Sequence, residues 1–197
     1  MSVEAPVAYE RESSKEPALV VQLENPNDLS HPKIQEMLHS LGMPTELFGQ
    51  LLRRELEPIS TAKFSLPPEG PTMEDLDQHI VNTPLGLVEV SDCKLYPPAA
   101  PSRDNTGLHL KVGKGGFEVI YVLKGEAALT FPQTVNPVGG VYFASEERKN
   151  VVLTPGTLAI IPAPTANGWF EVGEGFEFRY ICLPPWHESF VRPALDR

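Results

Sequence analysis

The sequence predicts a mainly β protein, a sandwich or barrel of short strands that follows a short N-terminal helical segment. From residue 85 onward, short apolar runs recur, and Gly, Pro, Asn or Asp occupies most of the gaps between them. The 21 prolines of the chain are typical of turns and strand ends rather than of long helices. No helical pattern separates the runs after residue 85, which argues against alternating strands and helices.

Eight segments have the composition of strands, and turn residues bound most of them. They are Leu87–Val90, Leu108–Val112, Glu118–Leu123, Ala127–Phe131, Val151–Leu153, Leu158–Ile161, Gly168–Val172 and Phe176–Leu183. The sequence contains no internal repeat, so we expect one barrel rather than two. Residues 85–197 are assigned to this barrel.

Residues 1–17 are polar and lack periodicity, which predicts a flexible tail. Residues 18–84 are assigned to an N-terminal helical segment and a Pro-rich connector. This segment opens with a short apolar run, Leu19–Leu23, which favours a strand or a segment laid against the body. Within the connector, we expect a helical turn around Met73–Ile80.

Two short helices are predicted between residues 30 and 57. Ser30 is a suitable N-cap for the first helix, and Thr45 for the second. Apolar residues then recur at helical spacing. In the first helix they are Ile34, Met37, Leu38 and Leu41, and in the second Leu47, Phe48, Leu51, Leu52 and Leu56. Two helices this small cannot bury their own core, so we expect them to pack on the barrel or on another subunit.

Charge and composition restrict the partners of the protein. The chain has 197 residues, of which 41% are hydrophobic and 21% charged, and its formal net charge is −10. Such a charge argues against nucleic-acid or anionic-membrane binding, because both need a basic field. The first residues lack the pattern of a signal peptide, and no apolar run reaches the roughly 20 residues that span a bilayer. We expect a soluble, cytoplasmic protein in which Cys93 and Cys182 are free buried thiols.

Two segments carry the most specific signal. Glu118 and Gly125 enclose an apolar strand with the spacing E-x6-G, and Gly156 and Pro162 enclose a second one with the spacing G-x5-P, with a loop expected between them at Gln133–Asn150. In this order the two segments resemble the paired motifs of the cupin family, over roughly residues 85 to 185. The resemblance implies a cupin-type β-barrel, also called a double-stranded β-helix or jelly roll, which usually holds a metal ion.

The resemblance also shows what is missing. Glu118 lies where the family has its glutamate ligand, but the two preceding histidine positions fall on Lys111 and Gly113, or in the other spacing on Val112 and Lys114. Asn167 replaces the last histidine. A transition-metal site needs about three good protein ligands, usually rich in imidazole. We therefore expect no metal and no cofactor, with a displaced site of His109 and Glu118 as the alternative.

Five residues are predicted to converge on one pocket. Glu118 and His109 are the candidate catalytic acid/base residues, and Lys111, Asn167 and Arg179 are the candidate substrate-binding residues. His109 and Lys111 follow from strand alternation, but alternation in Phe176–Tyr180 leaves open whether Arg179 or the aromatic residues face the interior. In the structural alternative, Glu118 forms only a buried ion pair with Lys111 or Arg179.

Three function classes follow from this interpretation. The favoured one is a metal-independent cupin-like enzyme that moves a proton on a small polar metabolite, in an isomerisation, epimerisation, cyclisation or elimination. The second is a non-catalytic barrel that binds a small ligand or serves in assembly. The third is a metal-dependent dioxygenase with unusual ligands. The expected partners are a small-molecule ligand and a second copy of the chain in a homodimer, since the resemblance implies pairing through strand exchange or sheet edges.

Overall fold

The structure is a computed structural model that describes residues 9–10, 16–61, 72–96, 109–111, 116–138, 141–185 and 191–196. Side chains are described for residues 16–60, 78–96, 116–136, 138 and 142–185. Two helices, α1 (Pro32–Ser40) and α2 (Thr45–Arg53), lie near the N-terminus. The strands are β1 (Tyr9–Glu10), β2 (Leu19–Gln22), β3 (Ser60–Thr61), β4 (Thr72–Thr83), β5 (Gly86–Tyr96), β6 (His109–Lys111), β7 (Phe117–Lys124), β8 (Ala127–Pro132), β9 (Thr134–Val138), β10 (Val141–Ala144), β11 (Arg148–Leu153), β12 (Thr157–Pro162), β13 (Ala166–Phe170), β14 (Phe176–Leu183) and β15 (Val191–Asp196).

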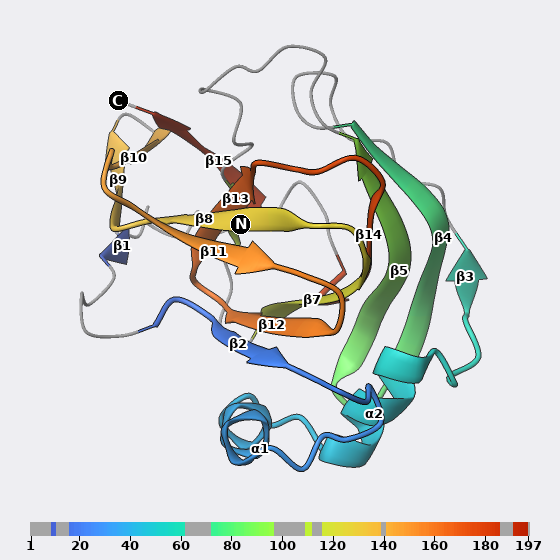
Figure 1. Ribbon diagram of the computed structural model, residues 1–197. Helices are drawn as coiled ribbons and strands as arrows, with labels where there is room; N and C mark the ends of the chain where they lie inside the picture. The colour runs from blue at the N-terminus through green and yellow to red at the C-terminus, as the bar shows by residue number, and fades with distance from the viewer. Residues whose placement is uncertain are drawn as a thin grey trace.

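The strands form two sheets (Figure 1). One has the order β2-β12-β7-β14-β5-β4-β3 and the other β1-β9-β10-β15-β6-β13-β8-β11. At their centres lie two groups of four antiparallel strands, β12-β7-β14-β5 and β6-β13-β8-β11. From β5 to β8 and from β11 to β14, successive strands alternate between the two groups. This alternation is the connectivity of a double-sheet jelly roll, so the predicted mainly β fold class is confirmed.

Two glycines of the motif segments close tight turns beside this core. Gly125 has φ +74°, and a Cβ there would lie 2.9 Å from the backbone Cα of Phe176. Gly156 has φ +84°, and its Cβ would lie 2.8 Å from the carbonyl oxygen of Leu23. Only glycine adopts this left-handed conformation without strain and also leaves room for the neighbouring backbone. The two glycines therefore hold the ends of β7 and β12 in place.

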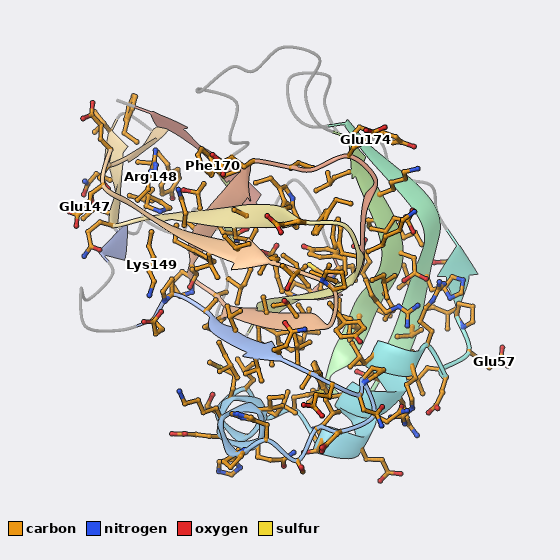
Figure 2. All side chains as sticks on the ribbon, in the orientation of Figure 1. Glu57, Glu147, Arg148, Lys149, Phe170 and Glu174 are labelled. Carbon is orange, nitrogen blue, oxygen red and sulfur yellow. The ribbon has the colours of Figure 1, made fainter. Side chains whose placement is uncertain are left out.

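One apolar core fills the space between the sheets (Figure 2). Both sheets contribute to it, with Ile120 of β7 and Phe178 of β14 on one side and Leu129 of β8 on the other. Trp169 of β13 packs edge-on against Phe176, with ring centroids 5.4 Å apart. Figure 2 places the labelled charged side chains, such as Glu57 and Glu174, at the periphery.

A second core lies on the outer face of the seven-stranded sheet, where the two helices cover it (Figure 1). Phe48 and Leu51 of α2 are 0% and 1% exposed and pack in the same cluster as Val119 of β7 and Leu158 of β12. The helices thus bury their apolar faces on the sheet, as the sequence predicts. Among the described residues, neither helix has the length and apolar content that crossing a membrane requires.

Several local predictions are corrected by the structure. His31, not Ser30, is the N-cap of α1, because the hydroxyl of Ser30 donates to Asp28. Pro44, not Thr45, precedes α2. The expected helical turn around residues 73–80 is wrong, since this segment belongs to β4 and pairs with β5 along its length. Two further strands, β9 and β10, lie within the segment between the motifs where a loop is expected.

Candidate functional site

A row of polar side chains crosses three neighbouring strands of the seven-stranded sheet. Glu118 on β7 lies directly opposite Cys182 on β14, which in turn lies directly opposite Glu89 on β5. In the next row, Tyr180 on β14 lies opposite Ser91 on β5. Directly opposed residues of an antiparallel pair share a face of the sheet. All five residues therefore lie on the inner face, towards the other sheet.

Glu118 is the centre of the best-defined contacts in this cluster. Its side chain is buried, with 2% exposed, and accepts one hydrogen bond on each carboxylate oxygen. The Asn167 amide, which reaches across from β13 of the other sheet, donates to Oε2 at 3.0 Å. The hydroxyl of Tyr180 donates to Oε1 at 2.7 Å. Two donors on a buried carboxylate stabilise its ionised form and fix its orientation.

The phenol of Tyr180 stays protonated over a wide range of pH. Burial raises the pKa of Tyr180 well above its ordinary value, and the neighbouring Cys182, Glu118 and Glu89 raise it further. A neutral phenol beside an anionic carboxylate is a hydrogen-bond donor. Tyr180 is therefore suited to hold Glu118 in place, because its single O–H proton is donated to that carboxylate.

Glu89 is a second buried carboxylate on the same face, with 4% of the residue exposed. Gln78 Nε2 from β4 and the hydroxyl of Ser91 both donate to its Oε1, each at 2.9 Å. Between the two glutamates, the thiol of Cys182 donates to the carbonyl oxygen of Pro184 at 3.1 Å. Among the described residues, the cluster thus contains two carboxyl groups, a phenol, a thiol, an aliphatic hydroxyl and two amides.

The structure brings together two of the five residues that the sequence predicts for the pocket, Glu118 and Asn167. It separates Arg179 from them, because Arg179 lies on the outer face of β14. There its guanidinium forms two hydrogen bonds with Asp92, at 2.6 and 2.9 Å, and Nη1 donates to the carbonyl oxygen of Leu52 in α2 at 2.6 Å. The expected convergence of Arg179 with Glu118 is therefore corrected.

The other two predicted residues, His109 and Lys111, lie on β6, and their side chains fall outside the described part of the structure. The backbone of β6 pairs with β13, and His109 is the register partner of Asn167. The roles of His109 and Lys111 remain predictions.

Sequence reasoning misses Tyr180, Cys182 and Glu89. The alternation of residues 176–180 admits two orientations, and the structure selects the one with the aromatic side chains inside. Glu89 has the same sequence feature as Glu118, a carboxylate within an apolar strand. This feature could have identified Glu89 from the sequence. For Cys182 the sequence predicts only a buried free thiol, which the structure confirms.

The described side chains do not fit the imidazole-rich metal site of the family that the motifs resemble. Within the described ranges, no three His, Cys, Asp or Glu residues gather into a metal-binding group. Both oxygens of Glu118 already accept protein hydrogen bonds, and the Asn167 amide nitrogen faces the carboxylate as a donor. This donor set suits hydrogen bonding to an organic molecule better than coordination of a transition metal.

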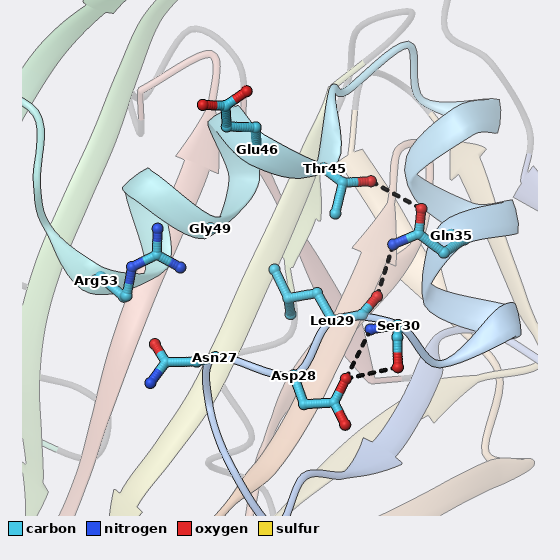
Figure 3. A pocket seen from close by; sticks show the side chains of 9 residues that line it. All are labelled: Asn27, Asp28, Leu29, Ser30, Gln35, Thr45, Glu46, Gly49 and Arg53. Atoms are coloured by element: carbon cyan, nitrogen blue, oxygen red, sulfur yellow. Dashed lines mark hydrogen bonds between the residues drawn. The ribbon is translucent and has the colours of Figure 1, made fainter.

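A hollow of about 590 Å³ lies away from this cluster, between the loop before α1 and the side of α2 (Figure 3). Several of its polar side chains are bonded to neighbours: Gln35 to Thr45 and to the Leu29 carbonyl oxygen, and Asp28 to Ser30. Arg53 forms two hydrogen bonds with Glu55.

The jelly-roll connectivity and the two motif segments define a cupin-type fold. No protein-family model and no curated protein matches the chain. Among solved structures, it is similar to a mutant of Bacillus subtilis oxalate decarboxylase, with 17% identity and a TM-score of 0.39 over 70% of this chain. The chain spans only 33% of the length of that protein.

Two other similar structures are nearer to this chain in length. One is a Klebsiella pneumoniae protein with a double-stranded β-helix domain, at 17% identity and a TM-score of 0.39, covering 72% of this chain and 92% of that one. The other is ectoine synthase from P. lautus, at 12% identity and a TM-score of 0.36, covering 66% of this chain and 80% of that one. At these identities the likeness concerns the fold alone.

Proposed function

We propose that this protein binds a small polar molecule at the buried cluster of Glu118, Asn167 and Tyr180 and transfers a proton to or from it without a metal ion. The observation that carries the proposal is the pair of hydrogen bonds to the Glu118 carboxylate, at 2.7 Å from Tyr180 and 3.0 Å from Asn167. A buried carboxylate with a fixed orientation is a suitable general base.

Each residue has a distinct role in this proposal. Glu118 accepts the proton from the bound molecule. Tyr180, kept neutral by burial and by its acidic neighbours, donates its one O–H proton to Glu118 and orients that carboxylate. Asn167 is a positioning residue, since its amide holds one carboxylate oxygen and leaves the orientation of the other to Tyr180. His109 and Lys111 are proposed as additional acid/base and binding groups from β6.

A non-catalytic binding protein is the second candidate. It is favoured by one observation: the described hydrogen bonds of the cluster join protein groups to one another, as they do in a polar core that only specifies the packing. Both candidates predict a small-molecule ligand and no nucleic acid. We also propose a homodimer, which sedimentation or light scattering of the full chain tests directly.

Deuterium exchange separates the two candidates. The protein is incubated in D2O with a panel of small carbonyl compounds, namely hydroxyketones, aldoses and 2-oxo acids, and carbon-bound hydrogen is followed by proton NMR. The enzyme proposal expects exchange in at least one compound and a loss of about 10²-fold or more in Glu118→Gln. The matched control is Glu146→Gln, at an exposed position, which leaves the rate unchanged.

Two results contradict the enzyme proposal. One is exchange that proceeds equally fast in Glu118→Gln. The other is a panel without exchange together with a Glu118→Gln variant that only loses stability, by roughly 1–3 kcal/mol, because one of its two donors is left without an acceptor. The second result supports the binding or structural role instead.

A further inference from the structure

The hollow beside α2 takes no part in the proposed function, and α2 places an arginine on its wall in a fixed position. Arg53 is the last residue of α2 and lines the hollow. Its Nε and Nη2 donate to the two carboxylate oxygens of Glu55, at 2.7 and 2.9 Å. A bidentate bond of this kind fixes the plane of the guanidinium as well as its place. Arg53 is therefore an oriented cation at the edge of the hollow.

Gly49 makes room for this position of Arg53. Residues four apart on a helix lie on the same face, so Arg53 follows Gly49 by one turn. A Cβ at Gly49 would lie 2.8 Å from Nη1 of Arg53, so a larger residue there would push the guanidinium away. Glycine weakens the middle of a helix relative to alanine. The place that it leaves for Arg53 is what the helix gains in return.

One edge of the Arg53 guanidinium has no acceptor among the described residues. Glu55 occupies the edge formed by Nε and Nη2. The edge formed by Nη1 and Nη2 remains, and Nη1 is the atom that lies over Gly49, a residue that also lines the hollow. A second carboxylate fits such an edge with two parallel hydrogen bonds. The geometry of Arg53 therefore favours a ligand that carries a carboxylate.

Asp28 supplies the opposite charge. Figure 3 shows Arg53 on the α2 side of the hollow and Asp28 on the side of the loop before α1. The hydroxyl and the backbone N–H of Ser30 both donate to Oδ1 of Asp28, at 2.6 and 3.0 Å, and they lower the pKa of this carboxyl group. Within the described part of the chain, no group donates to Oδ2. Asp28 is therefore an ionised, oriented acceptor for a cationic group.

The balance of charge argues against a ligand that carries only one of the two charges. Asp28 and Glu46 are the acidic residues that line the hollow, and Arg53, its basic residue, already has Glu55 as a counter-ion. A simple carboxylate would meet this excess of negative charge, and a simple amine would leave the second edge of Arg53 unused. A molecule with both groups complements both sides of the hollow.

We propose that this hollow binds a small zwitterion of the amino-acid type, with its carboxylate on Arg53 and its ammonium group on Asp28. The volume of about 590 Å³ lies within the range of small-molecule sites. The site is open to water, since the Arg53 side chain is 35% exposed, so we expect a dissociation constant of about a millimolar. The proposal is independent of the role of Glu118.

Amide NMR of the isotope-labelled full chain tests the proposal. The probes are glycine, β-alanine and γ-aminobutyrate, which hold a carboxylate and an ammonium group at increasing separation, together with butyrate and butylamine, which carry one group each. At least one zwitterion should shift the signals of Ser30 and Gly49 saturably and bind about 10-fold more tightly than butyrate or butylamine. If no zwitterion binds, or if butyrate or butylamine binds equally well, the proposal is overturned.

Three variants assign the binding to this hollow. Arg53→Gln and Asp28→Asn each remove one charge, and each should weaken binding of the zwitterion about 10-fold or more. Gly49→Ala changes no charge and favours the helix, but its Cβ displaces the Arg53 guanidinium, so binding should weaken while the melting temperature does not fall. Glu57→Gln, at an exposed position outside the hollow, is the control and should keep the wild-type affinity. Unchanged affinity in any of the first three variants overturns the proposal.

Discussion

Arg179 and Tyr180 are consecutive residues of β14, and their side chains lie on opposite faces of the sheet. Tyr180 donates to Glu118 at 2.7 Å on the inner face, and Arg179 binds Asp92 and the Leu52 carbonyl oxygen on the outer face. β14, which carries Tyr180, is therefore linked through its outer face to the C-terminal end of α2. Each residue gives a separate prediction.

Replacing Asp92 by Asn is expected to destabilise the protein by about 3 kcal/mol, because the partly buried Arg54 and Arg179 lose their counter-charge. Denaturant unfolding at neutral pH measures this loss. The control is Glu177→Gln, whose partner Lys124 is exposed and 3.9 Å away, and it changes stability by less than about 1 kcal/mol. Equal effects of the two substitutions would show that the cluster of Asp92, Arg54 and Arg179 (the Asp92 cluster) contributes no more to stability than a surface ion pair.

The Asp92 cluster also predicts a pH dependence. Burial alone would raise the pKa of Asp92, but hydrogen bonds and charges of Arg179 and Arg54 hold that pKa below its ordinary value of 3.8. A lowered pKa in the folded state gives stability that is complete above the unfolded value and is lost as pH falls through the folded value. The difference in unfolding free energy between wild type and Asp92→Asn should therefore shrink below about pH 4.

Tyr180 gives the opposite dependence at alkaline pH. Its pKa is raised above 10.0 in the folded protein, so its contribution is complete below that pH and is lost as pH rises through the folded value. In Tyr180→Phe, stability should fall less steeply above about pH 10 than in the wild type. Identical slopes in wild type and Tyr180→Phe contradict a buried phenol at Tyr180.

The packing of the helices on the sheet predicts a large cost for truncating Phe48. Its ring is completely buried against the outer face, so Phe48→Ala should lower the free energy of unfolding by about 3–5 kcal/mol. Ile59, which is 61% exposed, is the matched control, and Ile59→Ala should stay within about 0.5 kcal/mol of wild type. A small effect at Phe48 would mean that the helices are accessory to the barrel.

The motif glycine Gly125 can be compared with Gly42, which has a similar φ of +66° but no atom within 4 Å of the position that a Cβ would occupy. Gly42→Ala should cost roughly 1–2 kcal/mol from backbone strain alone. Gly125→Ala should cost more, because its Cβ also meets the Phe176 backbone at 2.9 Å. Thermal melts of both variants test the difference. Equal melting temperatures would show that the close approach of the Phe176 backbone adds nothing to the cost in stability.

Metal analysis of the purified protein tests the proposed metal independence. We expect less than stoichiometric Fe, Mn, Ni or Zn, because the donor set around Glu118 is poor in imidazole among the described residues. The measurement is elemental analysis after dialysis against a mild chelator. About one retained equivalent per chain, lost in Glu118→Gln but kept in Glu146→Gln, would instead support the displaced site.

The sequence predicts the strands of both motifs and two central residues of the site. The other features of the site cannot be predicted from it, for physical reasons. Glu118 and Asn167 can be found because Glu118 keeps the motif spacing to Gly125, and Asn167 the motif spacing to Gly156 and Pro162. The orientation of β14 cannot, because both of its faces are buried, the inner one by the opposite sheet and the outer one by α2. No residue of β14 is fully exposed: buried and half-buried residues alternate over Phe176–Arg179, but the alternation ends at Tyr180.

The segment at residues 73–80 shows a different limit. Its acidic, locally helical composition is outweighed by the pairing of β4 with β5, of which seven residue pairs lie in this segment, an interaction that a local pattern does not contain. The place of Glu89 in the site depends on other long-range pairings, because the strand order β7-β14-β5 puts it in the row of Glu118.

The pairing of β2 with β12 determines the order in which this chain can fold. Gln22 meets Thr157 across a separation of 135 residues, and the amide of Leu23 donates to the Gly156 carbonyl oxygen. During synthesis, the segment that carries β2, α1 and α2 is made long before β12 and β14. Its apolar faces therefore stay uncovered until these strands have been synthesised. Pairing between segments so far apart in the sequence slows folding, and the nascent chain cannot complete the seven-stranded sheet until β12 has been synthesised.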